Sequence, residues 1–162
     1  MLEWGNLLPS CKKCNIKKDE HDVEAEPIVN PFVDNPKDFL YFSFYRYKAK
    51  NEIGQSTIKA LGINHTDHFV LPRREVGNGI IATLEDLREN IDNIGSPKER
   101  KYIRKIKNLL ERGNRKKEYA ALTASTILQD DNFSFIEKVL KEKNLWDSEL
   151  ADLKEELIFC AL

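Results

Sequence analysis

The stretch GIIATLEDLRENIDNIG, residues 79–95, decides what kind of fold most of this chain adopts. Its apolar residues recur at intervals of four, three, four and three, at Ile80, Leu84, Leu87, Ile91 and Ile94. That spacing places them on one face of an α-helix, and Gly95 with the nearby Pro97 provides the expected stop. The pattern predicts a helix that buries one apolar face, and hence a helical bundle.

Residues on the C-terminal side continue the helical pattern. The basic segment 98–117 has one apolar face and stops at Gly113; that face consists of Tyr102, Ile103, Ile106, Leu109 and Leu110. Further helices are predicted over about residues 116–128, around Phe133, Ile136 and Leu140, and after a cap at Asp147 or Ser148. The C-terminal part is therefore predicted to be mostly helical.

On the N-terminal side the pattern changes. Residues 27–38 hold three prolines and predict an ordered connector. FLYFSFYRY, residues 39–47, alternates and predicts one strand, with Leu40, Phe42 and Phe44 on one side. Residues 55–61 predict a short helix that ends at Gly62. The predicted class is α+β, with an irregular front of about residues 1–75 before the bundle. The predicted domains are residues 1–38 and a mainly helical region, 39–162, with one strand near 39–47.

Composition limits the class of protein. The 162 residues are 41 % apolar, enough for one domain with a core. Lys and Arg number 26 and Asp and Glu 27, a balance that excludes a wholly basic nucleic-acid coat protein. No run is apolar enough for a membrane span, and the first residues do not form a secretory signal. Three cysteines, two of them close together, favour a reducing cytoplasm.

Charge is concentrated in blocks. Residues 11–18 carry four lysines and no acid, whereas residues 98–117 hold ten basic residues against Glu99 and Glu111. Residues 19–38 and 130–156 are acidic. Basic stripes are expected where a protein contacts phosphates, although a solvated helix face is an equally simple interpretation.

Cys11 and Cys14 have C-x-x-C spacing, which lets two thiolates share one Zn²⁺. Two ligands are half of a tetrahedral site, and Cys160 is far away in the sequence. The pair alone is compatible with half a zinc site, a redox pair or coincidence. The redox interpretation is disfavoured because no βαβ pattern surrounds it.

The residues around this pair resemble the HNH endonuclease family. In that ββα-metal fold, a loop carries Asn followed by Leu, and a helix opens with C-x-x-C-[HN]-x-x-K. Asn6-Leu7 and Cys11-x-x-Cys14-Asn15-x-x-Lys18 match these two parts. Residues 3–8 and 30–36 look like the HNH effectors of bacterial anti-phage systems, the PtuB-like and retron-associated nucleases. The resemblance implies a partial ββα-metal segment in front of the helical bundle.

That resemblance implies a metal-dependent endonuclease that hydrolyses DNA phosphodiester bonds. Such chemistry needs an activated water and a divalent cation that neutralises developing charge. Asn15 would offer an amide oxygen to Mg²⁺ or Mn²⁺, Asn6 would hold its loop, and Cys11 and Cys14 would bind structural Zn²⁺. Plain turn and cap chemistry is the simpler interpretation of both asparagines. The expected phosphate contacts are Lys12, Lys13, Lys17, Lys18, Arg104 and Lys107.

Part of the family pattern has no counterpart here. The first C-x-x-C and the catalytic His should precede Asn6 by tens of residues, whereas the three histidines lie downstream. We therefore expect the general base and two zinc thiolates to be missing, through truncation or a start assigned too late. His21 is an alternative metal ligand, although a solvated acidic turn explains it more simply. His65 and His68 are interpreted as loop residues.

Three functional hypotheses follow from the sequence. The first is an HNH-type DNA endonuclease of an anti-phage system, paired with an ATPase partner that docks on the acidic 130–156 surface. The second is a catalytically inactive module that binds nucleic acid or a partner. The third is a metal-free helical adaptor with free thiols. The sequence also allows a homodimer, in which two C-x-x-C pairs would form one Cys₄ zinc site.

Overall fold

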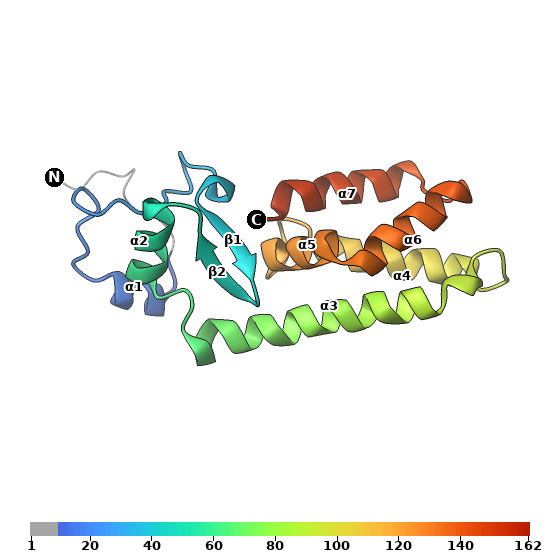
Figure 1. Cartoon of the computed structure of the whole chain (residues 1–162), viewed down its shortest axis with the longest axis horizontal. Coiled ribbons are helices and arrows are strands. Elements are labelled where there is room, and N and C mark those ends of the chain that lie inside the picture. The colour runs from blue at the N-terminus through green and yellow to red at the C-terminus, as the bar shows by residue number, and fades with distance from the viewer. Residues whose placement is uncertain (1–9) are drawn as a thin grey trace. The chain divides into compact units, whose positions relative to one another are not determined.

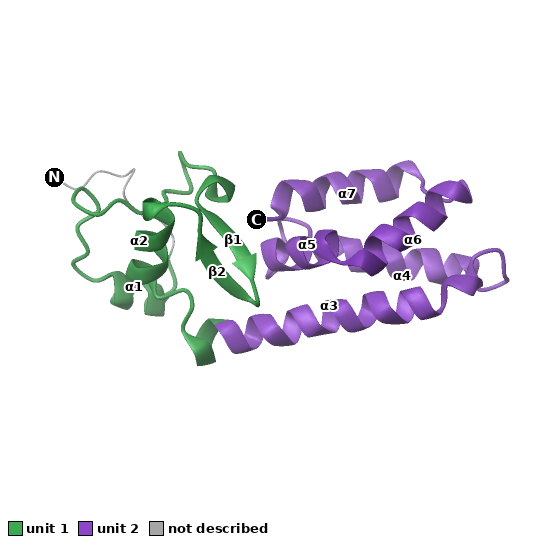
Figure 2. Ribbon diagram, in the orientation of Figure 1, with its two compact units in different colours: residues 1–69 green, residues 70–162 purple. Residues whose placement is uncertain are grey.

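A computed structural model describes residues 10–162, and the chain divides into two compact units, residues 1–69 and 70–162 (Figure 2). Asn6 lies outside the described residues. The mostly helical α+β class that the sequence predicts is confirmed. The first unit ends at residue 69, and within it α2 packs against both β2 and α1 and so joins the hairpin to the N-terminal helix. The predicted division into residues 1–38 and 39–162 stays a prediction.

The described part of the first unit is built around one hairpin (Figure 1). Its elements are α1 (Lys12–Lys18), a 3₁₀ turn (Pro36–Asp38), β1 (Leu40–Ser43), β2 (Arg46–Ala49) and α2 (Glu52–Leu61). Helix α2 approaches the chain before β1 so closely that a Cβ atom on Gly54 would lie 2.2 Å from the Phe39 carbonyl oxygen. Only glycine allows this approach.

The predicted single strand over residues 39–47 is wrong. Ser43 pairs with Arg46, so the chain reverses through Phe44 and Tyr45 and forms an antiparallel hairpin. Both turn residues have positive φ, 48° and 63°, as a two-residue type I′ turn requires. The sequence signal typical of this turn is Asn-Gly, whereas this chain has two aromatic residues at these positions. Phe44 is consequently 90 % exposed at the tip and does not join Leu40 in the core.

Local caps fix both ends of α2. The Asn51 side chain accepts a hydrogen bond from the Gly54 N–H (3.0 Å), and Gly62 ends α2 in the left-handed region with φ 61°. The predicted stop at Gly62 is therefore confirmed. The chain then passes through a π-helical turn, Thr66–Val70, into the long helix of the second unit.

The second unit is a bundle of packed helices, drawn in purple in Figure 2. It contains α3 (Leu71–Glu89), a 3₁₀ turn (Ile91–Asn93), α4 (Glu99–Glu111), α5 (Ala120–Gln129), α6 (Asp131–Glu142) and α7 (Ser148–Cys160). Helix α3 packs against α4, α5 and α6, and α7 packs against α4 and α5. Among residues 10–162, no helix combines the length and the apolar character needed to cross a membrane.

The predicted core of the bundle is confirmed, but two helix ends differ. Ile80, Leu84 and Leu87 are almost fully buried in one cluster. Helix α3 begins at Leu71 because Pro72 stands in its first turn, where a missing N–H has no cost. It ends at Glu89, so Ile91 and Ile94 contact the core from outside the helix. Helix α5 begins at Ala120, after the basic segment 115–117, and not near residue 116.

Gly113 packs closely against a buried leucine of the bundle and gives the first prediction. A Cβ atom there would lie 2.1 Å from Cδ2 of Leu157, which is fully buried. We expect Gly113→Ala to lower the free energy of unfolding by about 1–3 kcal/mol through overpacking. Gly79→Ala is the matched control, because no atom lies within 4 Å of that Cβ position in α3. It should stabilise by about 0.5–1 kcal/mol. Urea unfolding monitored by circular dichroism measures both, and equal effects would contradict this packing.

The Arg115–Glu156 pair gives a prediction about acid stability. Arg115 donates two side-chain hydrogen bonds (2.7 and 2.6 Å) and one backbone hydrogen bond (2.9 Å) to the Glu156 carboxylate. The side-chain bonds, followed by the backbone bond, lower the pKa of Glu156 to about 2. The resulting stability is present above the ordinary pKa of 4.5 and is lost as pH falls toward 2.

We therefore expect thermal melts to show a smaller drop in Tm between pH 5 and pH 2 for Arg115→Gln than for the wild type. Arg112→Gln serves as the control, because Arg112 is exposed and has no carboxylate within 4.0 Å in the described part of the chain. Identical acid profiles for the wild type and Arg115→Gln would show that this pair contributes nothing to folding.

Candidate functional site

Helix α1 carries most of the residues that the motif singles out. Cys11 is its N-cap, and the Cys11 sulfur accepts a hydrogen bond from the Cys14 backbone N–H (3.3 Å). That hydrogen bond lowers the pKa of the Cys11 thiol, with a smaller contribution from the charge of Lys13. Cys11 is exposed and Cys14 is half-buried. A lowered pKa favours the thiolate, which is the form of cysteine that binds metals.

The described residues do not complete a metal site around this pair. A structural zinc ion takes four ligands, and Cys11 and Cys14 supply two. Among residues 10–162, no three His, Cys, Asp or Glu side chains are grouped closely enough to hold a metal ion. The His21 ring is used inside its own loop, where Nε2 donates to the Glu26 carbonyl oxygen (2.8 Å). The Zn²⁺ site and the metal role of His21 thus stay predictions.

Asn15 lies one helical turn after Cys11 and is exposed on α1. This position presents the side-chain amide to solvent, where it is accessible to a ligand. A single exposed amide does not make a site for Mg²⁺ or Mn²⁺, which takes six oxygen ligands. The catalytic role of Asn15 stays a prediction, as does that of Asn6, which lies outside the described residues.

The four predicted phosphate contacts of the first unit all project from α1. Lys12, Lys13 and Lys17 are exposed and Lys18 is half-buried. In the region from residue 10 onward, no carboxylate lies within 4.0 Å of any of these ammonium groups. Their charges are therefore not neutralised locally, and α1 presents a positive potential that attracts anions.

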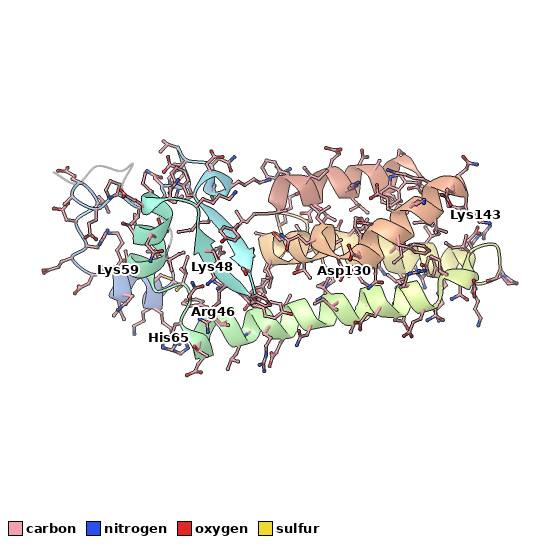
Figure 3. The ribbon with its side chains drawn as sticks, in the orientation of Figure 1. Arg46, Lys48, Lys59, His65, Asp130 and Lys143 are labelled. Atoms are coloured by element: carbon pink, nitrogen blue, oxygen red, sulfur yellow. The ribbon has the colours of Figure 1, made fainter. Side chains whose placement is uncertain are left out.

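The π-helical turn brings two histidines to this basic helix. His65 and His68 stack with ring centroids 4.7 Å apart. The ammonium nitrogen of Lys13 lies 2.6 Å from Nδ1 and 2.9 Å from Nε2 of His68. Figure 3 shows His65 on the segment that joins α2 to α3. The sequence-based interpretation of the pair as plain loop residues missed this contact. Their spacing of three residues, typical of one helical face, was the available signal.

A pocket of about 680 Å³ lies between α1, α2 and this turn. One part of its wall is apolar, formed by Ile16, Ile58, Leu61 and Phe69. The other part is polar and carries Lys13, Lys17, Asp19, Asn64, His65 and His68. A volume of this size is typical of small-molecule sites, which are mostly apolar with a few placed polar groups.

The second basic block is used partly inside the bundle. Lys107 on α4 donates to Asp147 (2.6 Å) and to Glu149 on α7, and its side chain is only 19 % exposed. These hydrogen bonds raise the pKa of Lys107. Lys105 likewise pairs with Asp86. Arg104 is exposed and, among the described residues, has no carboxylate within 4.0 Å. The predicted phosphate contact by Lys107 would therefore compete with two carboxylates.

Comparison with known proteins supports part of the sequence-based assignment. No family model matches the chain, and no solved structure matches it. The chain is similar to the Septu protein PtuB of Bacillus thuringiensis, with 35 % identity over 156 residues that cover 92 % of this chain. It spans about 60 % of the length of that relative. The predicted likeness to PtuB-like proteins is thus confirmed, whereas the HNH assignment stays a prediction.

Proposed function

We propose that this chain acts in bacterial anti-phage defence as an HNH-type endonuclease that hydrolyses DNA. The similarity to a Septu PtuB protein supports the defence role. The segment Cys11-x-x-Cys14-Asn15-x-x-Lys18 supports the HNH assignment, because α1 begins at this segment as the family pattern requires. The observation that carries the proposal is the basic face of α1 beside the Cys pair, whose ammonium groups have no carboxylate within 4.0 Å among residues 10–162.

In this proposal the residues of α1 bind and orient the DNA backbone. Lys12, Lys13, Lys17 and Lys18 offer ammonium donors to phosphate oxygens, each as a charge-assisted hydrogen bond. Cys11 and Cys14 would provide half of a structural Zn²⁺ site, and a second copy of the chain could supply the other two thiolates. Asn15 would hold a Mg²⁺ or Mn²⁺ ion, which supplies charge neutralisation at phosphorus when bound. Among residues 10–162, neither site has its full set of metal ligands.

A second candidate is a catalytically inactive module that binds DNA or a partner. The observation that favours it is the absence of a complete metal-ligand group among residues 10–162. The basic face of α1 would serve such a module equally well. Binding without cleavage separates this candidate from the first.

We also propose the predicted ATPase partner, but the charges of segment 130–156 support it less strongly than the basic face of α1 supports DNA binding. Five of the acids in 130–156 pair with basic residues of the same bundle: Glu137, Glu142, Asp147, Glu149 and Glu156. Burial opposes ionisation of Glu137, but hydrogen bonds from Lys141 and Lys154 outweigh it and lower its pKa. Much of the acidic surface is therefore neutralised inside the bundle and attracts a basic partner only weakly.

A plasmid-nicking experiment tests the proposed activity. The wild-type chain is incubated with supercoiled DNA and Mg²⁺ or Mn²⁺, beside Asn6→Ala and Asn15→Ala. We expect the wild type to nick the plasmid and Asn15→Ala to lose at least about a hundredfold in rate, because it removes a metal ligand. Asn6→Ala should also lose activity, because its loop is no longer held in place. Asn108→Ala, an exposed asparagine on α4, is the matched control and should keep full activity.

The outcomes separate the two candidates. Nicking that is lost in Asn15→Ala and kept in Asn108→Ala supports the endonuclease. A wild type that binds DNA but leaves it intact contradicts the endonuclease and supports the inactive module. Nicking of equal rate in all variants would mean that the asparagines have no catalytic role.

A further inference from the structure

We propose that the pocket between α1, α2 and the π-helical turn binds a nucleotide through its terminal phosphate, with Lys13, Lys17 and His68 as the phosphate clamp. The Cys pair is not part of the pocket wall, but Lys13 and Lys17 belong both to the pocket and to the proposed DNA-binding face of α1. The inference does not depend on nuclease activity. Its ligand class follows from two features of the wall, a cluster of nitrogen donors and a facing apolar surface.

The Lys13–His68 contact has more donors than acceptors. An ammonium group has three hydrogen-bond donors, whereas a neutral imidazole has a single acceptor nitrogen. Lys13 nevertheless faces both ring nitrogens of His68, at 2.6 and 2.9 Å. Within residues 10–162 no carboxylate lies within 4.0 Å of this ammonium group. An anion with several oxygens, such as a phosphate monoester, satisfies the remaining donors of both side chains.

Lys17 also lines the pocket, and its stem is packed against the backbone. Its stem lies across Gly62, where a Cβ atom would be 3.0 Å from Cγ and 3.7 Å from Cδ and Cε. Gly62 has φ 61°, a conformation that favours glycine, and the absence of a side chain leaves room for the lysine stem. A stem packed in this way loses less conformational freedom when its ammonium group binds a ligand. Asp19 is the one carboxylate among the described residues of the wall, and it favours a ligand whose negative charge is confined to one end.

The apolar wall fits the other end of a nucleotide. Ile16 is 63 % exposed, an unusual state for an isoleucine on a helix, and it faces the pocket together with Ile58, Leu61 and Phe69. A flat base would cover this surface, and the His65–His68 stack adds a second aromatic face. Inorganic phosphate alone would leave the apolar wall uncovered. A nucleotide satisfies both parts of the wall.

Calorimetric titration of the full chain tests this inference. The probes are dAMP, deoxyadenosine and inorganic phosphate. We expect dAMP to bind at least about tenfold more tightly than either fragment, because it engages both walls. Lys13→Gln and His68→Ala should each weaken dAMP binding about tenfold or more. Ile16→Asp, at an exposed position that the fold tolerates, should do the same through like-charge repulsion.

Matched controls lie beside each substituted residue. Lys12→Gln removes a neighbouring charge of α1 that is not in the pocket wall, and Thr66→Ala changes the same π-helical turn. Both should bind dAMP as the wild type does. Equal weakening by Lys12→Gln and Lys13→Gln would overturn the inference, because it would mean general charge attraction. Deoxyadenosine binding as tight as dAMP binding would overturn the phosphate clamp, and the absence of saturable dAMP binding would overturn the site.

The source of the nucleotide is resolved by a second titration. A short single strand with a 5′-phosphate is compared with the same strand lacking it, by fluorescence anisotropy. A preference for the phosphorylated strand that is lost in His68→Ala assigns the pocket to a DNA end. Equal affinity for both strands, with dAMP binding intact, assigns it to a free nucleotide. Either result is independent of plasmid nicking, so the failure of one proposal leaves the other open to test.

Discussion

The docking of α1 onto α2 is the constraint on which the candidate site depends. Helix α1 has seven residues and none of them is buried. Isolated helices of that length are not stable in water, and Lys13 and Lys17 repel each other one turn apart. The helix persists because Cys11 caps its first turn and because α2 lies beside it, with Gly62 leaving room for the Lys17 stem. The Cys pair, Asn15 and the basic face keep their positions only while this contact holds.

The two units use their charges differently. In the bundle, basic residues are paired with acids across helices, such as Lys107 with Asp147 and Arg115 with Glu156. These pairs hold α4 and the segment after it against α7. On α1 the lysines face solvent and a pocket. The net charge of −1 therefore does not reflect how the charges are used. In the bundle they stabilise the fold, and on α1 they are available for ligands.

The sequence predicts the bundle well because periodic burial dominates there. The spacing of Ile80, Leu84 and Leu87 predicts a buried face that the structure confirms, and Asp147 caps α7 as expected. The hairpin is not predicted because its turn residues, Phe44 and Tyr45, adopt positive φ although neither is glycine or asparagine, the residues typical of such a turn. The sequence does not predict the pocket, because Lys13 and His68 are 55 residues apart. The helix stop at Gly62 also gives no reason to expect the helical turn that follows it.

The central claim is that α1 is the surface that meets phosphate, and the salt dependence of DNA binding tests it most directly. Affinity for a duplex is measured at several salt concentrations for the wild type, for Lys12→Gln with Lys18→Gln on α1, and for Lys101→Gln with Arg104→Gln on α4. We expect the slope of log K against log salt to fall by about 0.9 for each α1 lysine that contacts a phosphate, and to fall by less for the α4 pair, in which Arg104 alone is a predicted phosphate contact. An unchanged slope in the α1 variant, with a reduced slope in the α4 variant, would contradict the account and move the interface to the bundle.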